Sequence, residues 1–164
     1  NRPEPGERAA TATLQSFLDE RGRTYRRGMS SPISAQSACS RLSPFISVGC
    51  ISIRQILQHT KKKMEAVKRD PRARENLGWS GSLSSFQSRL AWHCHFIQRL
   101  EVELTLDSIA MNPEIDSHLN SSMDDLRYQA WAKGKTGWPF FDACMRSLIA
   151  TGSVSYTHLT LPTT

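Results

Sequence analysis

The segment from Ser82 to about Leu100 carries two adjoining apolar stripes at helical spacing, and this pattern constrains the fold more than any other feature. The stripes consist of Leu83, Phe86, Leu90 and Ile97, with Trp92 and Phe96 beside them. Apolar residues three and four positions apart share one face of an α-helix. A helix with two such faces is predicted to be buried on more than one side. We therefore expect this helix to be central to the fold.

Most of the remaining chain shows the same helical period, and no stretch alternates as a strand does. Further helices are predicted over 7–20, 44–49, 53–70, 123–132 and 139–152. Ser52 and Gln55 form the Ser-x-x-Gln pattern of a capping box at the start of the 53–70 helix. Asp142 and Arg146 lie four residues apart on the last helix, which favours an ion pair, internal or on the surface. The predicted fold class is all-α, an irregular array of helices.

Length and charge bound the kind of protein. The 164 residues are enough for one domain, but the large apolar faces of the helices need partners, which favours a piece of a larger domain. The formal net charge of +6 suits a polyanion such as nucleic acid, although basic runs are often only the solvated face of a helix. No apolar run reaches the length of a membrane span. We expect a cytoplasmic protein without a membrane segment.

The stretch from Cys39 to Gly49 is a candidate anion site. Ser43 reads as an N-cap, and Pro44 follows it at the first helical position. Such a helix start presents unpaired N–H groups, and the hydroxyls beside it, with the Arg41 guanidinium, add donors that suit a phosphate. Any capped helix entry has a similar sequence. From these residues alone, both a phosphate site and a simple helix start remain open.

Three motifs resemble the FAD-binding domain of the photolyase/cryptochrome family, in the family's order and at about its spacing. They are Ser40-Arg41-Leu42-Ser43-Pro44 with the residues that follow it, Leu90-Ala91-Trp92, and the pattern Trp131-x-x-Gly-x-Thr-Gly-x-Pro-x-x-Asp-Ala-x-Met-Arg. The resemblance covers Gly6 to Gly152. It implies the N-terminal part of a helical flavin domain, with FAD as the cofactor.

The same resemblance implies which residues contact the flavin. The pyrophosphate and ribitol side is expected at residues 40–43, where Leu42 contributes its backbone, and the ring side is expected on the helix that carries Phe86. The predicted cofactor-binding residues are Tyr25, Ser40, Arg41, Leu42, Ser43, Phe86, Arg89 and His93. No catalytic residue is predicted, because Arg89 stands where repair members of the family carry a glutamate and many cryptochromes a glutamine. His93 similarly replaces an arginine.

The function implied for the intact protein is light-driven repair of a DNA photolesion by electron transfer from excited reduced FAD. Damaged DNA is then the expected partner, and the activity that of a deoxyribodipyrimidine photolyase-like carbon–carbon lyase. Arg89 departs from the repair pattern, so two alternatives stay open. One is a non-catalytic FAD blue-light receptor, and the other is a helical nucleic-acid binder without a cofactor. The fragment itself is expected to be inactive.

A metal site is not predicted. His93 and His95 flank Cys94, and residues two apart point about 200° apart around a helix, so the two imidazoles cannot converge on one ion. The four cysteines show no Cys-x-x-Cys spacing, and their spacing does not support an iron–sulfur cluster. We expect no metal in this chain.

The last eleven residues, Val-Ser-Tyr-Thr-His-Leu-Thr-Leu-Pro-Thr-Thr, are threonine-rich and break the helical period before them. A strand or a linker is the ordinary interpretation. The string also resembles the in-frame translation of a transposase adapter used to build sequencing libraries. We therefore expect a partial FAD-binding domain over 1–153 and a non-native tail over 154–164, with native sequence ending near Gly152.

Overall fold

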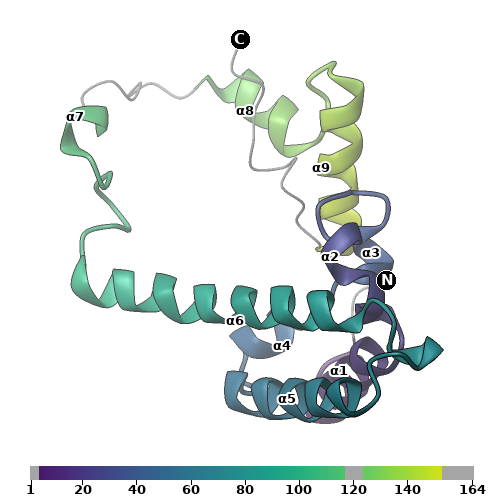
Figure 1. The fold of residues 1–164 in the computed structure, drawn as a ribbon. Coiled ribbons are helices and arrows are strands. Elements are labelled where there is room, and N and C mark those ends of the chain that lie inside the picture. The colour runs from purple at the N-terminus through teal and green to yellow at the C-terminus, as the bar shows by residue number, and fades with distance from the viewer. Residues whose placement is uncertain (1–3, 117–123, 153–164) are drawn as a thin grey trace.

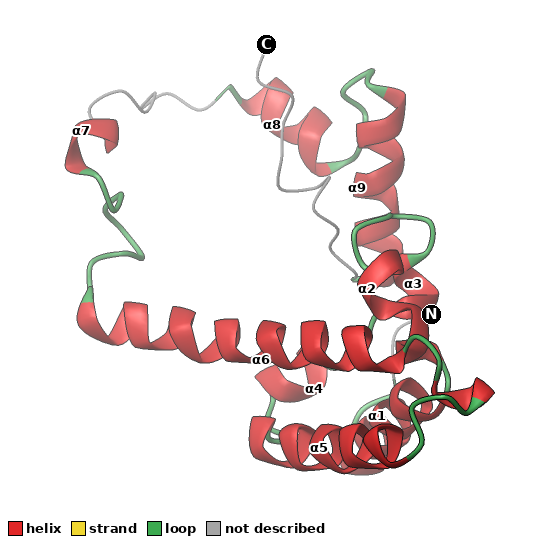
Figure 2. Ribbon diagram, in the orientation of Figure 1, coloured by secondary structure: helices red, strands yellow, loops and turns green. Residues whose placement is uncertain are grey.

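A computed structural model describes residues 4–116 and 124–152 of the chain. Every regular element in these ranges is a helix, which confirms the all-α prediction (Figure 2). The elements are, in chain order, α1 (Glu7–Asp19), the 3₁₀ helix η1 (Arg21–Thr24), α2 (Tyr25–Gly28), α3 (Ala35–Ala38), α4 (Ser43–Ser47), α5 (Ile53–Arg69), the 3₁₀ helix η2 (Arg74–Asn76), α6 (Trp79–Val102), α7 (Pro113–Asp116), α8 (Asp125–Ala132) and α9 (Pro139–Thr151). The predicted tail over 154–164 and the domain boundary before it lie outside the described residues.

The core lies where the first half of α6 packs against α1, α5 and the short helices η1 and α2 (Figure 1). Phe86 of α6 meets Phe17 of α1 at a ring-centroid distance of 4.6 Å, and Tyr25 of α2 lies 5.7 Å from both rings. Removing a phenylalanine side chain from water contributes about 2–3 kcal/mol. This aromatic cluster therefore fixes α6 across the helices that precede it.

The second half of α6 does not follow the prediction. Burial on α6 ends at Leu90, and Trp92, Phe96 and Ile97 are 52%, 56% and 46% exposed. The helix extends beyond α1, α4 and α5, and the chain then leads through α7 toward α8 and α9 (Figure 1). The expectation of burial on more than one side is thus wrong for this half in the described chain, because no described helix packs on it.

The observed helix starts can be compared with the caps that the sequence predicts. The predicted capping box at Ser52 is present, since its hydroxyl accepts from the Gln55 N–H and its own N–H donates to the Gln55 side chain. The predicted cap at Ser43 is wrong: α4 begins at Ser43 itself, Leu42 holds the cap position, and no side-chain cap bond forms. α6 begins earlier than predicted, directly after Gly78, whose left-handed φ of 84° suits glycine.

The last helices form a smaller unit. α8 and α9 pack together, and α9 lies next to α3 (Figure 1). A hydrogen bond of 3.5 Å from Gln36 to Ser147 links α3 to α9. α9 ends as predicted at Gly152, which has a left-handed φ of 68°. None of the described helices has both the length and the apolar character that a membrane crossing requires.

Candidate functional site

The segment before α4 is held in place by Arg21. Its guanidinium donates to the backbone oxygens of Cys39 at 2.6 Å and Ser40 at 3.4 Å. It also donates to the Thr13 carbonyl and the Ser16 hydroxyl of α1, at 3.1 Å and 3.0 Å. One side chain thereby ties the end of α1 to the residues that lead into α4.

Arg41 follows directly, with an unusual backbone. Its φ of 59° is the only positive value of a non-glycine residue in the described ranges. The left-handed region costs an ordinary side chain about 1 kcal/mol, so surrounding structure must hold it there. The Arg21 bonds to the two preceding carbonyls supply that constraint.

The electrostatics of this segment favour an anion. Burial lowers the pKa of the Arg21 guanidinium, and the nearby charge of Arg41 lowers it further. Burial raises the pKa of the Cys39 thiol against the opposing effect of the two arginines. Two guanidinium groups thus lie close together, and Arg21 donates to neutral oxygens.

The side chains of Ser40, Arg41 and Ser43 form no hydrogen bond or ion pair with any described residue. Their hydroxyl and guanidinium donors are therefore available to a ligand, and a phosphate group fits them chemically. Leu42, by contrast, is 1% exposed, so only its backbone can take part.

The other predicted residues on α6 and α2 show a gradient of exposure. Tyr25 and Phe86 are 8% and 3% exposed in the aromatic cluster, Arg89 is half-buried, and His93 is exposed. Phe86 also shares the core with Leu42, so the core joins the two predicted halves of the site. This gradient follows from α6 leaving the core after Leu90.

Two hollows lie along the first half of α6. One, of about 400 Å³, is lined by Arg26 and Met29 of the α2 region and by Ser84, Ser88, Arg89 and Trp92 of α6. The guanidinium of Arg89 lies over the Trp92 ring, 5.3 Å from its centroid. The other hollow, of about 530 Å³, lies at the start of α6. Residues 40–43 line neither of them.

Asp142 organises the turn between α8 and α9. Its carboxylate accepts from the Thr136 N–H at 2.9 Å, the Thr136 hydroxyl at 2.7 Å and the Gly137 N–H at 3.0 Å. Burial opposes ionisation, but these bonds and the charge of Arg146 outweigh it and lower the pKa of Asp142. The predicted contact ion pair with Arg146 is absent from the described chain, because Thr136 and Gly137 occupy the carboxylate.

Sequence reasoning did not single out Arg21 or Arg26. The position of Arg21 just beyond the end of α1 gave no signal for it, because its carbonyl partners are Thr13 in α1 and residues 18 and 19 positions further on. Arg26 carried no such signal, since its neighbour across the fold, Gly81, is 55 positions away. Among the described residues, no group of three or more His, Cys, Asp or Glu side chains is placed to hold a metal ion.

Comparison with known proteins shows which family the chain resembles in sequence. A family model described as the FAD binding domain of DNA photolyase matches residues 86–158. The chain is 32% identical over 151 residues to a deoxyribodipyrimidine photo-lyase of Synechococcus sp., covering 91% of this chain and 29% of the relative. It is 30% identical over 155 residues to the deoxyribodipyrimidine photo-lyase of Thermus thermophilus, covering 93% and 32%.

A cryptochrome DASH of Danio rerio is 30% identical over 152 residues, covering 92% of this chain and 27% of the relative. Relatives with both kinds of name therefore match at the same level. The chain spans about 30% of the length of the curated relatives it matches.

Proposed function

Because the chain belongs to the photolyase/cryptochrome family and carries part of its FAD-binding domain, we propose that the intact protein repairs a DNA photolesion with light. The family membership confirms the resemblance found in the sequence, and FAD is the cofactor of this domain. When bound, FAD supplies light absorption and the electron that a repair reaction needs. Damaged DNA is the partner that this activity requires.

Within this proposal, residues 40–43 hold the pyrophosphate and ribitol of FAD. The observation that carries it is the set of donors on Ser40, Arg41 and Ser43 that no described residue satisfies. Arg21 positions them by fixing the two carbonyls before Arg41. Arg89, half-buried beside Trp92, and the exposed His93 contribute from the side of α6, and Tyr25 and Phe86 support that side from the core.

Substitution of Arg41 tests the pyrophosphate assignment in the full-length protein. Arg41→Gln removes one charge-assisted interaction, so we expect FAD affinity to fall about tenfold to a hundredfold. The measurement is flavin absorbance retained after gel filtration, followed by titration of the stripped protein with FAD. Arg54→Gln, which removes the same charge from α5, should retain the wild-type affinity. Equal losses in both variants would reject the assignment.

A second function is favoured by Arg89. A non-catalytic blue-light receptor uses the same flavin pocket, and the resemblance places a glutamate at this position in repair members. Full-length protein should be mixed with dimer-containing DNA under blue light and in the dark, and dimers counted. Light-dependent loss of dimers supports repair. If the wild-type protein removes no dimers but the Arg89→Glu variant removes them under blue light, the receptor is supported.

A further inference from the structure

The hollow at the start of α6 is separate from residues 40–43. Its volume is about 530 Å³, which is within the range of small-molecule sites. Arg23, Arg26 and Arg27 of η1 and α2 line one side, and Gly78, Gly81 and Ser82 of α6 line the other. Three guanidinium groups therefore come from one short segment that faces the first turn of a long helix.

The backbone that carries these arginines is fixed to α6. Ser82 is 3% exposed, and its hydroxyl donates to the Arg23 carbonyl at 2.8 Å and accepts from the Arg26 N–H at 3.3 Å. Gly81 provides space on the helix surface, because a Cβ there would lie 3.1 Å from Nη1 of Arg26. The arginines are thus presented from a rigid support and not from a loose loop.

The charges of this hollow are not balanced from within the described chain. No aspartate or glutamate lines it, and the three guanidinium groups form no hydrogen bond or ion pair with any described residue. Three positive side chains that line one hollow without an acidic neighbour favour an anion there. The partial positive charge at the start of α6 acts in the same direction.

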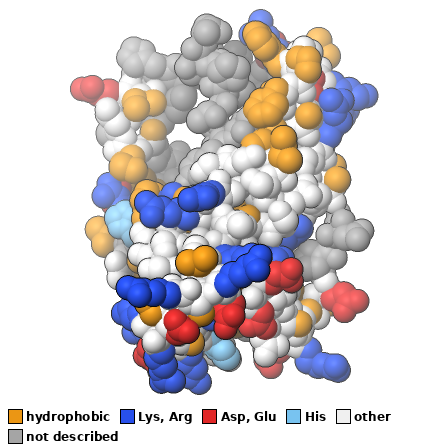
Figure 3. Space-filling view, turned by 45° about the vertical axis from the view of Figure 1, so that its right-hand side comes forward, with side chains coloured by type: hydrophobic (Ala, Val, Ile, Leu, Met, Phe, Trp, Pro, Cys, Tyr) orange, Lys and Arg blue, Asp and Glu red, His pale blue; other side chains and the backbone are white. Residues whose placement is uncertain are grey.

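We infer that the hollow lined by Arg23, Arg26 and Arg27 is a phosphate-binding site, separate from residues 40–43, that takes a phosphate group. Arginine presents its donors in a fork that matches phosphate oxygens. Figure 3 shows that the Lys and Arg side chains on the face it displays form separate groups, with acidic side chains between some of them. A free nucleotide and a nucleic-acid backbone share the required chemistry.

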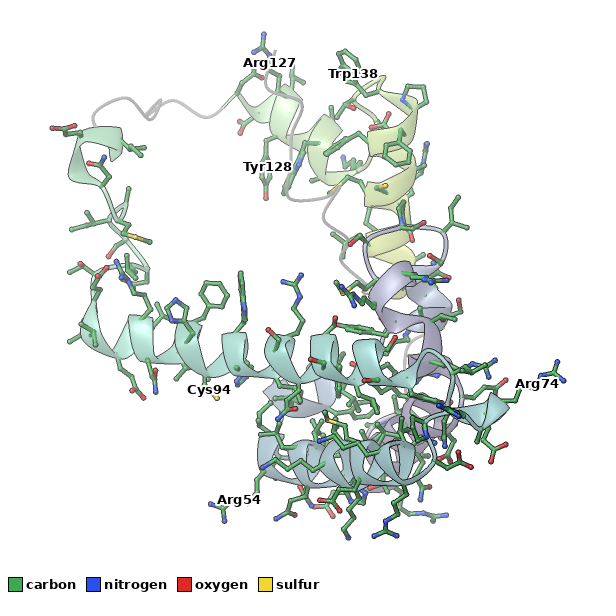
Figure 4. All side chains as sticks on the ribbon, in the orientation of Figure 1. Arg54, Arg74, Cys94, Arg127, Tyr128 and Trp138 are labelled. Atoms are coloured by element: carbon green, nitrogen blue, oxygen red, sulfur yellow. The ribbon has the colours of Figure 1, made fainter. Side chains whose placement is uncertain are left out.

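The test uses the full chain of 164 residues without flavin, so it can fail while the flavin assignment succeeds, and the reverse. Pyrophosphate binding is measured by calorimetry, and binding of a labelled twelve-nucleotide single strand by fluorescence anisotropy over a salt series. The variant Arg23→Gln with Arg27→Gln leaves Arg26 and its packing on Gly81 intact. The matched control is Arg54→Gln with Arg74→Gln, two arginines that point away from the body of the molecule (Figure 4).

We expect the hollow variant to bind pyrophosphate at least about tenfold more weakly and the control to change less than about twofold. If the strand is the ligand, its binding falls in the same variant and its salt slope decreases by about two charges. If a small phosphate compound is the ligand, pyrophosphate binding depends on the two arginines and strand binding does not. Equal weakening in both double variants, or no weakening in the hollow variant, overturns the site. Circular dichroism of both variants checks that the helices are retained.

Discussion

At the scale of single residues, two side chains hold loops that the helices alone do not define. Arg21 binds the carbonyls before Arg41, and Asp142 binds the turn at Thr136 and Gly137. Both act through several hydrogen bonds to backbone groups, which would otherwise need water or another partner. Each therefore makes a prediction that a single substitution can test.

Asp142→Asn should lower the thermal stability of the chain in a pH-dependent way. The pKa of Asp142 is lowered in the folded state, so its contribution is complete above the ordinary pKa of aspartate, about 3.9, and disappears as the pH falls through the folded value. The gap in Tm between wild type and variant should therefore be present at neutral pH and close on acidification. Asp19→Asn, on the exposed end of α1, is the control. A gap of constant size from neutral to acid pH contradicts the role given to the carboxylate.

Arg21→Gln should destabilise the chain by about 2 kcal/mol, because hydrogen bonds to a charged donor are lost and the carbonyls of Cys39 and Ser40 lose a partner. Urea unfolding followed by circular dichroism measures the change. Arg8→Gln, on the exposed face of α1, should stay within about 0.5 kcal/mol of wild type. A similar small change in both variants would mean that Arg21 does not brace the segment.

At the scale of elements, local signals predicted the longer helices but missed the short helices η1, α2 and α3, and they predicted the surroundings of the helices poorly. The capping box at Ser52 and the stop at Gly152 depend on neighbouring residues only, and both are present. The predicted start of α6 at Ser82 is three residues too late, because the helix begins at Trp79, directly after Gly78. Gly81 lies inside the helix although glycine has a low helix propensity, which is why the sequence suggested a turn there. Gly81 lies against the Arg26 side chain, a contact 55 positions away that no local pattern contains.

The candidate site shows the same division. The donors of Ser40, Arg41 and Ser43 could be proposed from the sequence because the motif that contains them carries the resemblance, and their role stays a prediction. Arg21, which braces them, is 18 and 19 residues from the carbonyls that it binds. Contacts at such separation depend on how α1 and η1 turn the chain, which a single sequence does not specify.

The joint between η1, α2 and α6 should depend on Ser82. Ser82→Ala removes both hydrogen bonds of this hydroxyl, so the Arg23 carbonyl and the Arg26 N–H lose this partner. We therefore expect the free energy of unfolding to fall by about 1–2 kcal/mol. Chemical denaturation is the measurement, with Ser80→Ala on the exposed side of the same helix as the control. A neutral Ser82→Ala would show that apolar packing alone fixes this joint.

At the scale of the whole molecule, the flavin site proposed at residues 40–43 would hold its ligand from one side within the described chain. Ser40 and Arg41 are half-buried and Ser43 is exposed, and a ligand held on one side keeps much of its surface in water. The 164-residue chain should therefore retain little FAD after gel filtration. The full-length protein should retain it. Stoichiometric FAD on the short chain would contradict this and would mean that residues 40–43 and their neighbours suffice.

The exposed half of α6 has a further consequence for the backbone itself. One continuous helix runs from a tightly packed end near Leu83 to an uncovered end near Val102. Its amide protons should accordingly exchange with deuterium at graded rates, slowest around Phe86 and fastest beyond Phe96. A segment that packs over Trp92 and Phe96 would therefore be detected as slower amide exchange in this half of α6, with the exchange around Phe86 as the internal reference.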